Sequence, residues 1–323
     1  MEFFRLSKPI NLMGKAKYFG ALSLTLVVLS WVLIFTKGFN YGIDFAGGTV
    51  IQIQYNQKAP LKKIREALKK DPKFADATVT NFGSPQEIII KTKSSSQSVN
   101  KDLSIKVNNL LANTGSFTIR RVDMVGPKIG SELREKGIEA TIYAILGILL
   151  YLTFRFEWRF ALASVIALIH DVSIAMGAIA LFNISFGLDT LAAILTILGY
   201  SLNDTIIVFD RIRETLIKSK ITDLFEVINN SVSKTLSRTT LTSLTTFFVV
   251  LVLYLFGGEI LKSFSFTLLV GVVVGTYSSI FVASPILKWL GFSVKGYKDM
   301  LAEKKKRELE KEKLRSQFEQ GVV

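Results

Sequence analysis

Cysteine is absent from this chain of 323 residues, and histidine occurs only once. The absence of cysteine excludes disulfide bonds and thiolate metal ligands, and a single histidine argues against a metal centre. We therefore expect neither a metal nor a cofactor, and no catalytic constellation is present that would make the chain an enzyme.

A single basic face is also missing. The net charge of +14 would suit a nucleic-acid-binding protein, but the basic residues are spread over short loops, a long domain and the tail. This distribution excludes nucleic acid as the expected partner. Apolar residues are abundant instead: 49% of the chain is hydrophobic and the mean hydropathy is +0.38. This composition indicates a membrane protein.

Uncharged apolar runs of about 18 residues or more predict transmembrane helices. At about 1.5 Å per residue, such a run reaches across the hydrocarbon core. The first run is longer than the core of an ordinary signal peptide and no small-residue cleavage site follows it, so we expect it to be retained. The six runs are Tyr18–Phe35, Ile138–Phe154, Phe160–Phe182, Leu188–Phe209, about Thr239–Phe256 and about Phe264–Leu287.

Lysine and arginine in the short loops predict the orientation, because they favour the cytoplasmic side. The loop Asn183–Gly187 contains none, whereas the tail from Lys288 onward contains ten. Both termini are therefore predicted to be cytoplasmic. The other basic residues of the predicted cytoplasmic side are Arg5, Lys8, Lys15, Lys17, Arg155, Arg159, Arg211, Arg213, Lys218, Lys220 and Lys234.

The stretch between the first two runs predicts a small α+β domain. Thr49–Tyr55 alternates apolar and polar residues, and three further stretches read as strands. Together with two amphipathic helices they follow the order βαββαβ, which is typical of a ferredoxin-like fold. A domain of this size suits binding and docking. The predicted strands are Thr49–Tyr55, Ala77–Phe82, Glu87–Thr92 and Phe117–Val125, and the helices are Leu61–Lys70 and Val99–Leu111.

The whole chain is thus predicted to be a helical multi-pass membrane protein with one small extracytoplasmic domain. The segment Asp210–Ser237 has apolar residues at helical spacing, which predicts an amphipathic helix near the membrane interface. The predicted organisation is a cytoplasmic tail at 1–17, a first transmembrane helix at 18–36, the extracytoplasmic domain at 37–136, a five-helix bundle at 137–290 and a charged cytoplasmic tail at 291–323.

Asp204 is a carboxylate inside the fourth apolar run. A charge there is unfavourable by roughly 2.5 to 3.5 kcal/mol on insertion scales, so such residues usually face a bundle interior, have a partner and mark an ion path. Arg238, at the edge of the fifth run, is predicted to lie at the same depth and to pair with Asp204. Asn203 flanks the acid. Thr235, Arg238, Thr242 and Thr245 fall on one predicted helical face.

Asp171, near the middle of the third run and next to His170, is a second and weaker candidate for ion coupling. Two alternatives remain open. The Asp204–Arg238 pair can be a fixed ion pair that only holds helices together, and Asp171 can be an interhelical hydrogen-bonding group. His170 can carry protons or pack as a neutral imidazole.

Four motifs resemble the SecF family of the bacterial protein-export apparatus. They are Gly42-Ile-Asp-Phe-Ala-Gly-Gly48, Val125-Gly-Pro-Lys-Ile-Gly-Ser-Glu-Leu133, Gly199-Tyr-Ser-Leu-Asn-Asp-Thr-Ile-Ile-Val-Phe-Asp-Arg-Ile-Arg-Glu214 and Ser237-Arg-Thr-Thr-Leu-Thr-Ser243. The resemblance covers residues 10–290. The related SecD subunits share some of this architecture, but the third motif and the single modest domain favour SecF.

This resemblance implies half of a transporter of the RND superfamily in the bacterial inner membrane. Such a subunit pairs with SecD and with the SecYEG channel, and with YajC or YidC as further candidate partners. It uses the proton or sodium gradient to assist late export of unfolded preprotein. By motif, Asp204 is the ion-coupling carboxylate and Arg238 its switching partner. Asp44, Phe45, Gly47, Gly48, Gly126 and Pro127 form the junction between the membrane half and the periplasmic domain.

Two other functions remain as alternatives. A small-molecule exporter of the same superfamily would need larger extracytoplasmic domains than this sequence has. A non-transporting scaffold would hold translocon subunits together without needing Asp204.

Overall fold

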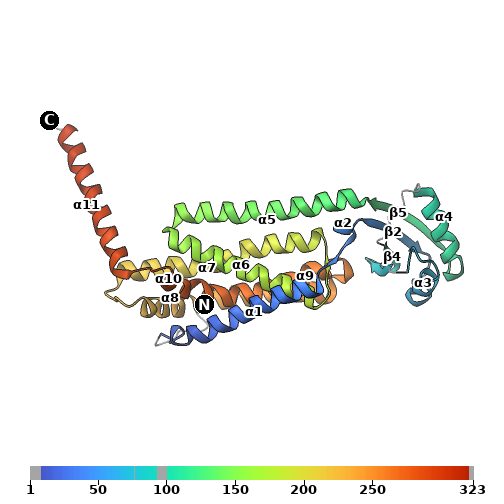
Figure 1. The fold of residues 1–323 in the computed structure, drawn as a ribbon, viewed down its shortest axis with the longest axis horizontal. Coiled ribbons are helices and arrows are strands. Elements are labelled where there is room, and N and C mark those ends of the chain that lie inside the picture. The colour runs from blue at the N-terminus through green and yellow to red at the C-terminus, as the bar shows by residue number, and fades with distance from the viewer. Residues whose placement is uncertain (1–8, 76, 93–99, 320–323) are drawn as a thin grey trace.

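The computed structural model describes residues 9–75, 77–92 and 100–319. Arg5, Lys8 and Val99, which entered the predictions above, lie outside the described residues. Within the described part, six helices are long and apolar enough to cross a membrane, and the prediction of six spans is confirmed. They lie side by side in an elongated helical half, with a smaller sheet domain at one end (Figure 1).

The helical half is formed by α1 and by α5 to α10. Figure 1 shows the long helices aligned along one axis. The chain reverses direction at each end of the bundle. The last of them, α9, continues through a π-helical turn at Ser279–Ala283 into α10. The bounds are α1 Ala16–Lys37, α5 Pro127–Arg155, α6 Trp158–Leu181, α7 Leu188–Lys218, α8 Leu224–Phe256, α9 Gly258–Ser278 and α10 Ser284–Trp289.

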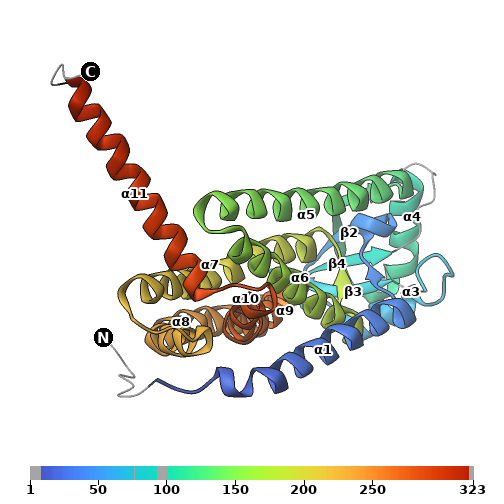
Figure 2. The same ribbon diagram turned by 60° about the vertical axis from the view of Figure 1, so that its left-hand side comes forward.

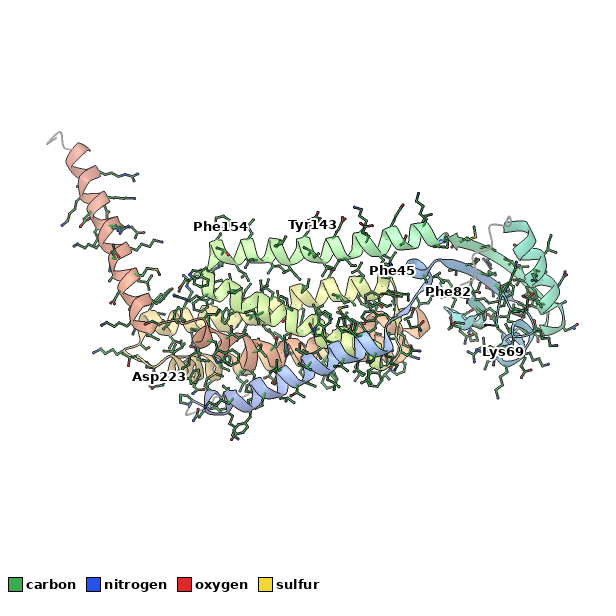
Figure 3. The ribbon with its side chains drawn as sticks, in the orientation of Figure 1. Phe45, Lys69, Phe82, Tyr143, Phe154 and Asp223 are labelled. Atoms are coloured by element: carbon green, nitrogen blue, oxygen red, sulfur yellow. The ribbon has the colours of Figure 1, made fainter. Side chains whose placement is uncertain are left out.

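Helix is present over most of Asp210–Ser237, as predicted, but it belongs to the ends of the two long helices α7 and α8. Helix α7 continues without interruption to Lys218, and α8 already begins at Leu224. Asp223 caps α8, because its side chain accepts a hydrogen bond from the Glu226 amide at 2.9 Å. The apolar residues of this segment therefore belong to extensions of the two long helices. Figure 3 places Asp223 at the end of the bundle opposite the sheet domain.

The sheet domain is ferredoxin-like, as predicted. Its four strands are antiparallel in the order β3-β4-β2-β5. Helices α3 and α4 cover one face, where Ile51, Ile53, Ile64, Ile90 and Val107 form a core in which each side chain is fully buried. The bounds are β2 Gly48–Tyr55, α3 Leu61–Leu68, β3 Thr78–Phe82, β4 Ser84–Thr92, α4 Asn100–Leu111 and β5 Phe117–Val125.

A second, two-stranded sheet ties the start of the domain to the helical half. β1 (Asn40–Tyr41) pairs in parallel with β6 (Ser185–Phe186), which lies between α6 and α7. The Gly42 amide adds a hydrogen bond to the Phe186 carbonyl at 2.9 Å. The sequence contains no signal for this pairing, because strands of two residues show no periodicity. The four-residue helix α2 (Ile43–Ala46) follows directly.

Small residues bring α9 and α7 into close contact. A Cβ atom added at Gly271 would lie 2.2 Å from the Ile197 side chain, and one added at Gly275 would lie 2.9 Å from Ser201. The spacing of four residues places both glycines on one face of α9, as the Gly-x-x-x-Gly pattern predicts. This close approach brings Ser201 of α7 and Ser278 of α9 within hydrogen-bonding distance of Asp171 on α6.

The final helix, α11 (Val294–Glu319), leaves the bundle at the end opposite the sheet domain. Figures 1 and 2 show it extending away from the other helices, with its last turns against none of them. Its mixed charges, including the Arg307–Glu303 ion pair at 2.6 Å, suit a solvated helix.

Candidate intramembrane acid site

Asp171 is the centre of a buried polar cluster that joins three helices. Its Oδ2 atom accepts hydrogen bonds from Ser201 of α7 at 2.5 Å and from Ser278 of α9 at 2.8 Å. Its Oδ1 atom lies 2.8 Å from Nδ1 of His170 on its own helix. All three partners are buried, and Asp171 has no exposed surface. Hydrogen bonds on both oxygens are what allow a carboxyl group to remain in an apolar interior.

Asp204 lies in a second polar cluster, between α7, α8 and α9. Its Oδ2 atom accepts a hydrogen bond from Ser243 of α8 at 3.1 Å, and the Ser243 hydroxyl oxygen in turn accepts one from Thr276 of α9 at 2.7 Å. Asp204 is 1% exposed. Its environment therefore holds fewer donors than that of Asp171. The arrangement leaves the carboxyl group buried and only lightly restrained.

Arg238 does not form the predicted ion pair with Asp204. Among the ion pairs of the described part of the chain, none joins these two residues, although Arg238 is near enough for its charge to act on the acid. The arginine side chain is exposed, and so are Thr242 and Asn203. The face of α8 that is buried against the bundle carries Thr235, Thr239 and Ser243 instead.

The polar face of α8 that is buried differs from the predicted one by a rotation about the helix axis. Thr235 belongs to the buried face, as predicted, whereas Arg238, Thr242 and Thr245 point away from the bundle. Residues four apart share a helical face, so Thr235, Thr239 and Ser243 form one row and Arg238 and Thr242 the neighbouring row. Packing against α7 and α9 selects the first row, because its small hydroxyl side chains fit a close helix contact.

Sequence reasoning missed the hydroxyl groups that hold the acids: Ser201, Ser243, Thr276 and Ser278. Each lies in an apolar helix, where serine and threonine usually bond to their own backbone and carry no special signal. Ser201 and Ser278 are fully buried. A helical Ser or Thr on the same face as a small-residue stripe is the feature that could have indicated them.

The junction between the two halves is packed backbone against backbone. Gly47 has φ +78°, and a Cβ atom there would lie 2.9 Å from the Cα atom of Pro127. A Cβ atom at Gly130 would lie 2.9 Å from the amide nitrogen of Gly47 and from the carbonyl oxygen of Phe45. Only glycine fits such contacts, and the positive φ independently favours it. Figure 3 labels Phe45 at this junction, where it is 4% exposed.

Gly126 and Pro127 begin α5 at the same junction. Gly126 is the N-cap residue, in an extended conformation, and Pro127 occupies the first turn, where its missing amide proton has no helical acceptor to lose. The motif residues thus start the second span at the point where the sheet domain ends.

Asp44 links this junction to the helix that carries Asp204. Its Oδ2 atom accepts a hydrogen bond from the Leu188 amide, the first residue of α7, at 3.2 Å. A carboxylate at a helix N-terminus satisfies a free amide and interacts favourably with the helix dipole. Asp44, predicted as a junction residue, is therefore also the residue that anchors α7.

Comparison with known proteins agrees with the fold and with the motifs. Residues 106–293 match the family model of the protein export membrane protein SecD/SecF C-terminal region, and residues 32–59 match the SecD/SecF GG motif. The chain is 46% identical over its full length to the protein translocase subunit SecF of Helicobacter pylori strain J99, all of which it covers. It is 45% identical to SecF of Calditerrivibrio nitroreducens over 89% of this chain and 96% of that one.

Solved structures give the same result. The crystal structure of SecDF from Thermus thermophilus, described as a translocon-associated membrane protein, matches 90% of this chain with a TM-score of 0.76 at 37% identity. This chain corresponds to 40% of that longer protein. A second SecDF structure, described as a super-membrane-facing form, matches with a TM-score of 0.69. The chain is a multi-pass membrane protein that belongs to the SecF family.

Proposed function

We propose that this chain is an auxiliary subunit of the Sec protein translocase that uses an ion gradient to drive late steps of protein export. The observation that carries the proposal is Asp204, a buried acid held by a single side-chain hydrogen bond in the middle of a transmembrane helix. The SecF relatives, 46% identical over the whole chain, support the export role.

Asp204 takes up and releases the coupling ion in this mechanism. The arrangement described here, in which Ser243 rather than Arg238 contacts the acid, suits the ion-loaded state. An approach of Arg238 to Asp204 would favour the ionised acid and expel the proton. One charge crossing 100 mV supplies about 2.3 kcal/mol, which biases a two-state rearrangement by well over tenfold.

Helix α7 transmits the change to the sheet domain. Asp204 follows Leu188, the first residue of α7, by 16 residues, which corresponds to about 24 Å along a helix. Because Asp44 holds that end of α7 and belongs to the glycine junction, a tilt or shift of α7 moves the attachment of the domain. Rigid helices with two packed arrangements are the usual carriers of such coupling.

The exposed polar residues Arg238, Asn203 and Thr242 are proposed to meet a SecD subunit. An arginine at membrane depth rarely faces lipid, and it is usually found against protein or water. The SecDF structures, in which a SecF-like part is 40% of one longer chain, support a SecD partner. Contacts with SecYEG, with YajC or YidC and with unfolded preprotein belong to the same proposal.

The proposed topology places both termini in the cytoplasm and the sheet domain in the periplasm. Two features of the fold support it: the described ends of the chain lie at one end of the bundle, and the sheet domain lies at the other (Figure 1). The basic loops Arg155–Arg159 and Arg211–Lys234 lie at the end with the termini.

The test is Asp204→Asn, reconstituted in vesicles with SecD and the translocation channel. We expect export to lose its dependence on the gradient while insertion and complex formation remain normal. Thr196→Val is the matched control on α7, because its hydroxyl bonds only to the backbone of its own helix. Gradient-dependent export by the Asp204→Asn variant would show that the chain acts as a scaffold.

A further inference from the structure

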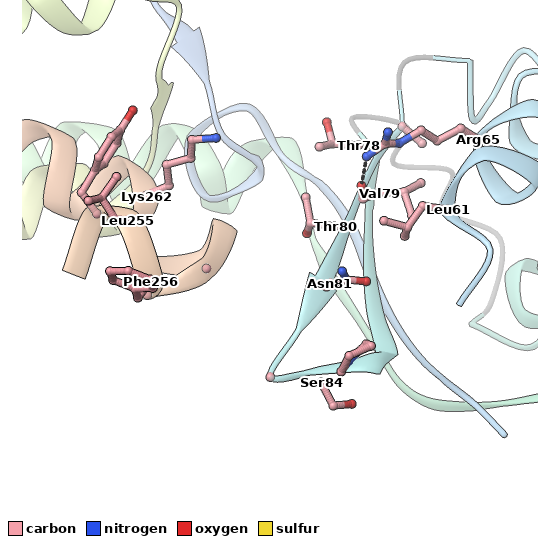
Figure 4. A pocket seen from close by; sticks show the side chains of 16 residues that line it. Leu61, Arg65, Thr78, Val79, Thr80, Asn81, Ser84, Leu255, Phe256 and Lys262 are labelled. Atoms are coloured by element: carbon pink, nitrogen blue, oxygen red, sulfur yellow. Dashed lines mark hydrogen bonds between the residues drawn. The ribbon is translucent and has the colours of Figure 1, made fainter. Parts of the chain in front are cut away.

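A cleft of about 880 Å³ separates the sheet domain from the end of the helical half. Figure 4 shows its two walls, with β3 on one side and Leu255, Phe256 and Lys262 on the other. Consecutive residues of β3, from Thr78 to Asn81, line the cleft. Because side chains of a strand alternate between faces, a wall made of consecutive residues is the edge of the strand rather than one of its faces.

The face of the same strand points elsewhere. Thr78 and Thr80, together with Ile89 and Lys91 of β4, also line a separate polar cavity of about 460 Å³ beneath the sheet. Val79, on the opposite face, is buried in the domain core. One face of β3 thus packs in the domain core, the other face lies over the polar cavity, and the hydrogen-bonding edge faces the cleft.

The two edges of the sheet differ in chemistry. β5, the other edge strand, carries Arg120, Arg121 and Asp123. Charged residues on an edge prevent further strands from pairing with it. β3 has the sequence Thr-Val-Thr-Asn-Phe, without a charge or a proline. The edge that faces the cleft therefore carries no charged residue of its own, and Arg65 of α3 caps the carbonyl of Val79 on it.

The opposite wall offers apolar surface to side chains. Leu255 is 61% exposed and Phe256 80% exposed at the end of α8, and Tyr254 also lines the cleft. Two cations are present as well: Lys262 lines the cleft, and Arg65 of α3 donates a hydrogen bond to the Val79 carbonyl at 2.8 Å. An occupant would bring backbone hydrogen bonds to one wall and apolar, neutral or acidic side chains to the other.

We infer that the cleft binds an extended segment of unfolded polypeptide, which displaces Arg65 from the Val79 carbonyl and adds as a strand to the edge of β3. Strand addition uses main-chain hydrogen bonds for affinity and accepts many sequences, as an export substrate requires. The inference rests on the proposed function for the identity of the polypeptide as a chain in transit. The wall formed by the helical half, where α9 approaches β3, also prevents pairing with the sheet of another molecule, so the edge admits at most a single strand.

Photo-cross-linking in the naturally cysteine-free chain tests this site. Asn81→Cys on β3 and Thr118→Cys on β5 are both exposed, uncharged positions on opposite edges of one sheet. Each variant, in nanodiscs, carries a benzophenone label and is offered reduced, carboxymethylated α-lactalbumin as a permanently unfolded probe. We expect cross-linking from position 81 to exceed that from position 118 by at least about tenfold, and native α-lactalbumin to give none.

A second variant makes the edge of β3 unfavourable for pairing and leaves the labelled position 81 unchanged. Thr78→Lys places a charge on β3 of the kind that β5 already carries, and it should lower cross-linking from position 81 about tenfold. Arg121→Lys, which keeps the charge on β5, is the matched control and should change nothing. Equal labelling from both edges, equal labelling of native protein or insensitivity to Thr78→Lys would overturn the site. Gradient-dependent export that still requires Asp204 would then leave the proposed function standing.

Discussion

The two intramembrane acids differ in how firmly their surroundings hold them. Asp171 receives hydrogen bonds from two helices and contacts His170, whereas the side chain of Asp204 has one hydrogen-bond partner, Ser243. A fully bonded buried group rigidifies a structure, and a lightly bonded one can exchange its partner more easily. The geometry therefore suits Asp171 to organising the bundle and Asp204 to cycling, with Asp171 as a coupling residue still a prediction.

Ser278→Ala should separate these roles. The change removes one of the two hydroxyl donors to Asp171 and leaves part of a buried carboxyl group unsatisfied, so stability should fall by about 1–3 kcal/mol. Thermal unfolding of the purified protein in detergent measures this loss. Thr153→Ala, whose hydroxyl bonds only to its own helix and is exposed, should remain close to the parent protein. An equal effect of both changes would mean that the cluster does not hold the helices together.

Arg238 should affect export without affecting the stability of the isolated chain. It is exposed and forms no ion pair with Asp204 here, so Arg238→Ala removes little from this state. In the proposed cycle the arginine is needed to expel the proton, so gradient-dependent export should be lost. Arg238→Lys should restore it only in part, because lysine cannot form the bidentate contact of a guanidinium. A silent Arg238→Ala variant in the export assay would contradict the switching role.

At the scale of elements, apolar length and periodicity made the fold predictable. The six spans follow from long apolar runs, β2 follows from its alternation, and β3 and β4 follow from short apolar stretches on either side of the turn Gly83-Ser84-Pro85. The helix predicted at Asp210–Ser237 was not recognised as the ends of α7 and α8, because polar residues reduce hydropathy without ending a helix. The β1–β6 pair could not be predicted at all, since two-residue strands are held by contacts distant in sequence.

The acid site was predictable only in part, because the hydroxyl partners of the acids come from other helices, distant in sequence. A carboxylate in an apolar run stands out in any sequence, and Asp171 and Asp204 are both buried as expected. Their partners depend on the rotation of each helix about its axis. A shift of one residue on α8 exchanges the row Arg238–Thr242 for the row Thr239–Ser243, and packing against neighbouring helices decides between them.

The glycine junction gives a prediction at this scale. Gly47→Ala should impair the junction, because Cβ would lie 2.9 Å from Pro127 in a backbone conformation with φ +78°. Strain of this kind costs on the order of 1–3 kcal/mol. Gly126→Ala, one residue before Pro127, meets no atom within 4 Å and has φ −67°, so it should be tolerated. Protease sensitivity between α1 and α5 and gradient-dependent export measure both variants, and equal behaviour would show that compactness at Gly47 is unimportant.

For the whole molecule, the question is whether the sheet domain moves against the helical half during export. The two halves are joined at the glycine junction, at the β1–β6 pair and where β3 approaches α9, and two cavities lie beside these contacts. A boundary interrupted by two cavities permits relative motion. The contact of Asp44 with the first residue of α7 couples that motion to α7, because it connects the domain to the helix that carries Asp204.

Locking the domain should therefore stop gradient-dependent export. Lys91 and Ser263 line opposite walls of the polar cavity, and cysteines at these positions can be joined by a reducible bis-maleimide linker. The absence of native cysteines makes the reaction specific to the introduced pair. We expect the joined protein to assemble normally and to lose gradient-dependent export, and reduction of the linker to restore it. Each single-cysteine variant, treated with the same reagent, should export normally. Export by the joined protein at the rate of the reduced one would exclude motion of the domain from the mechanism and would leave ion coupling confined to the helical half.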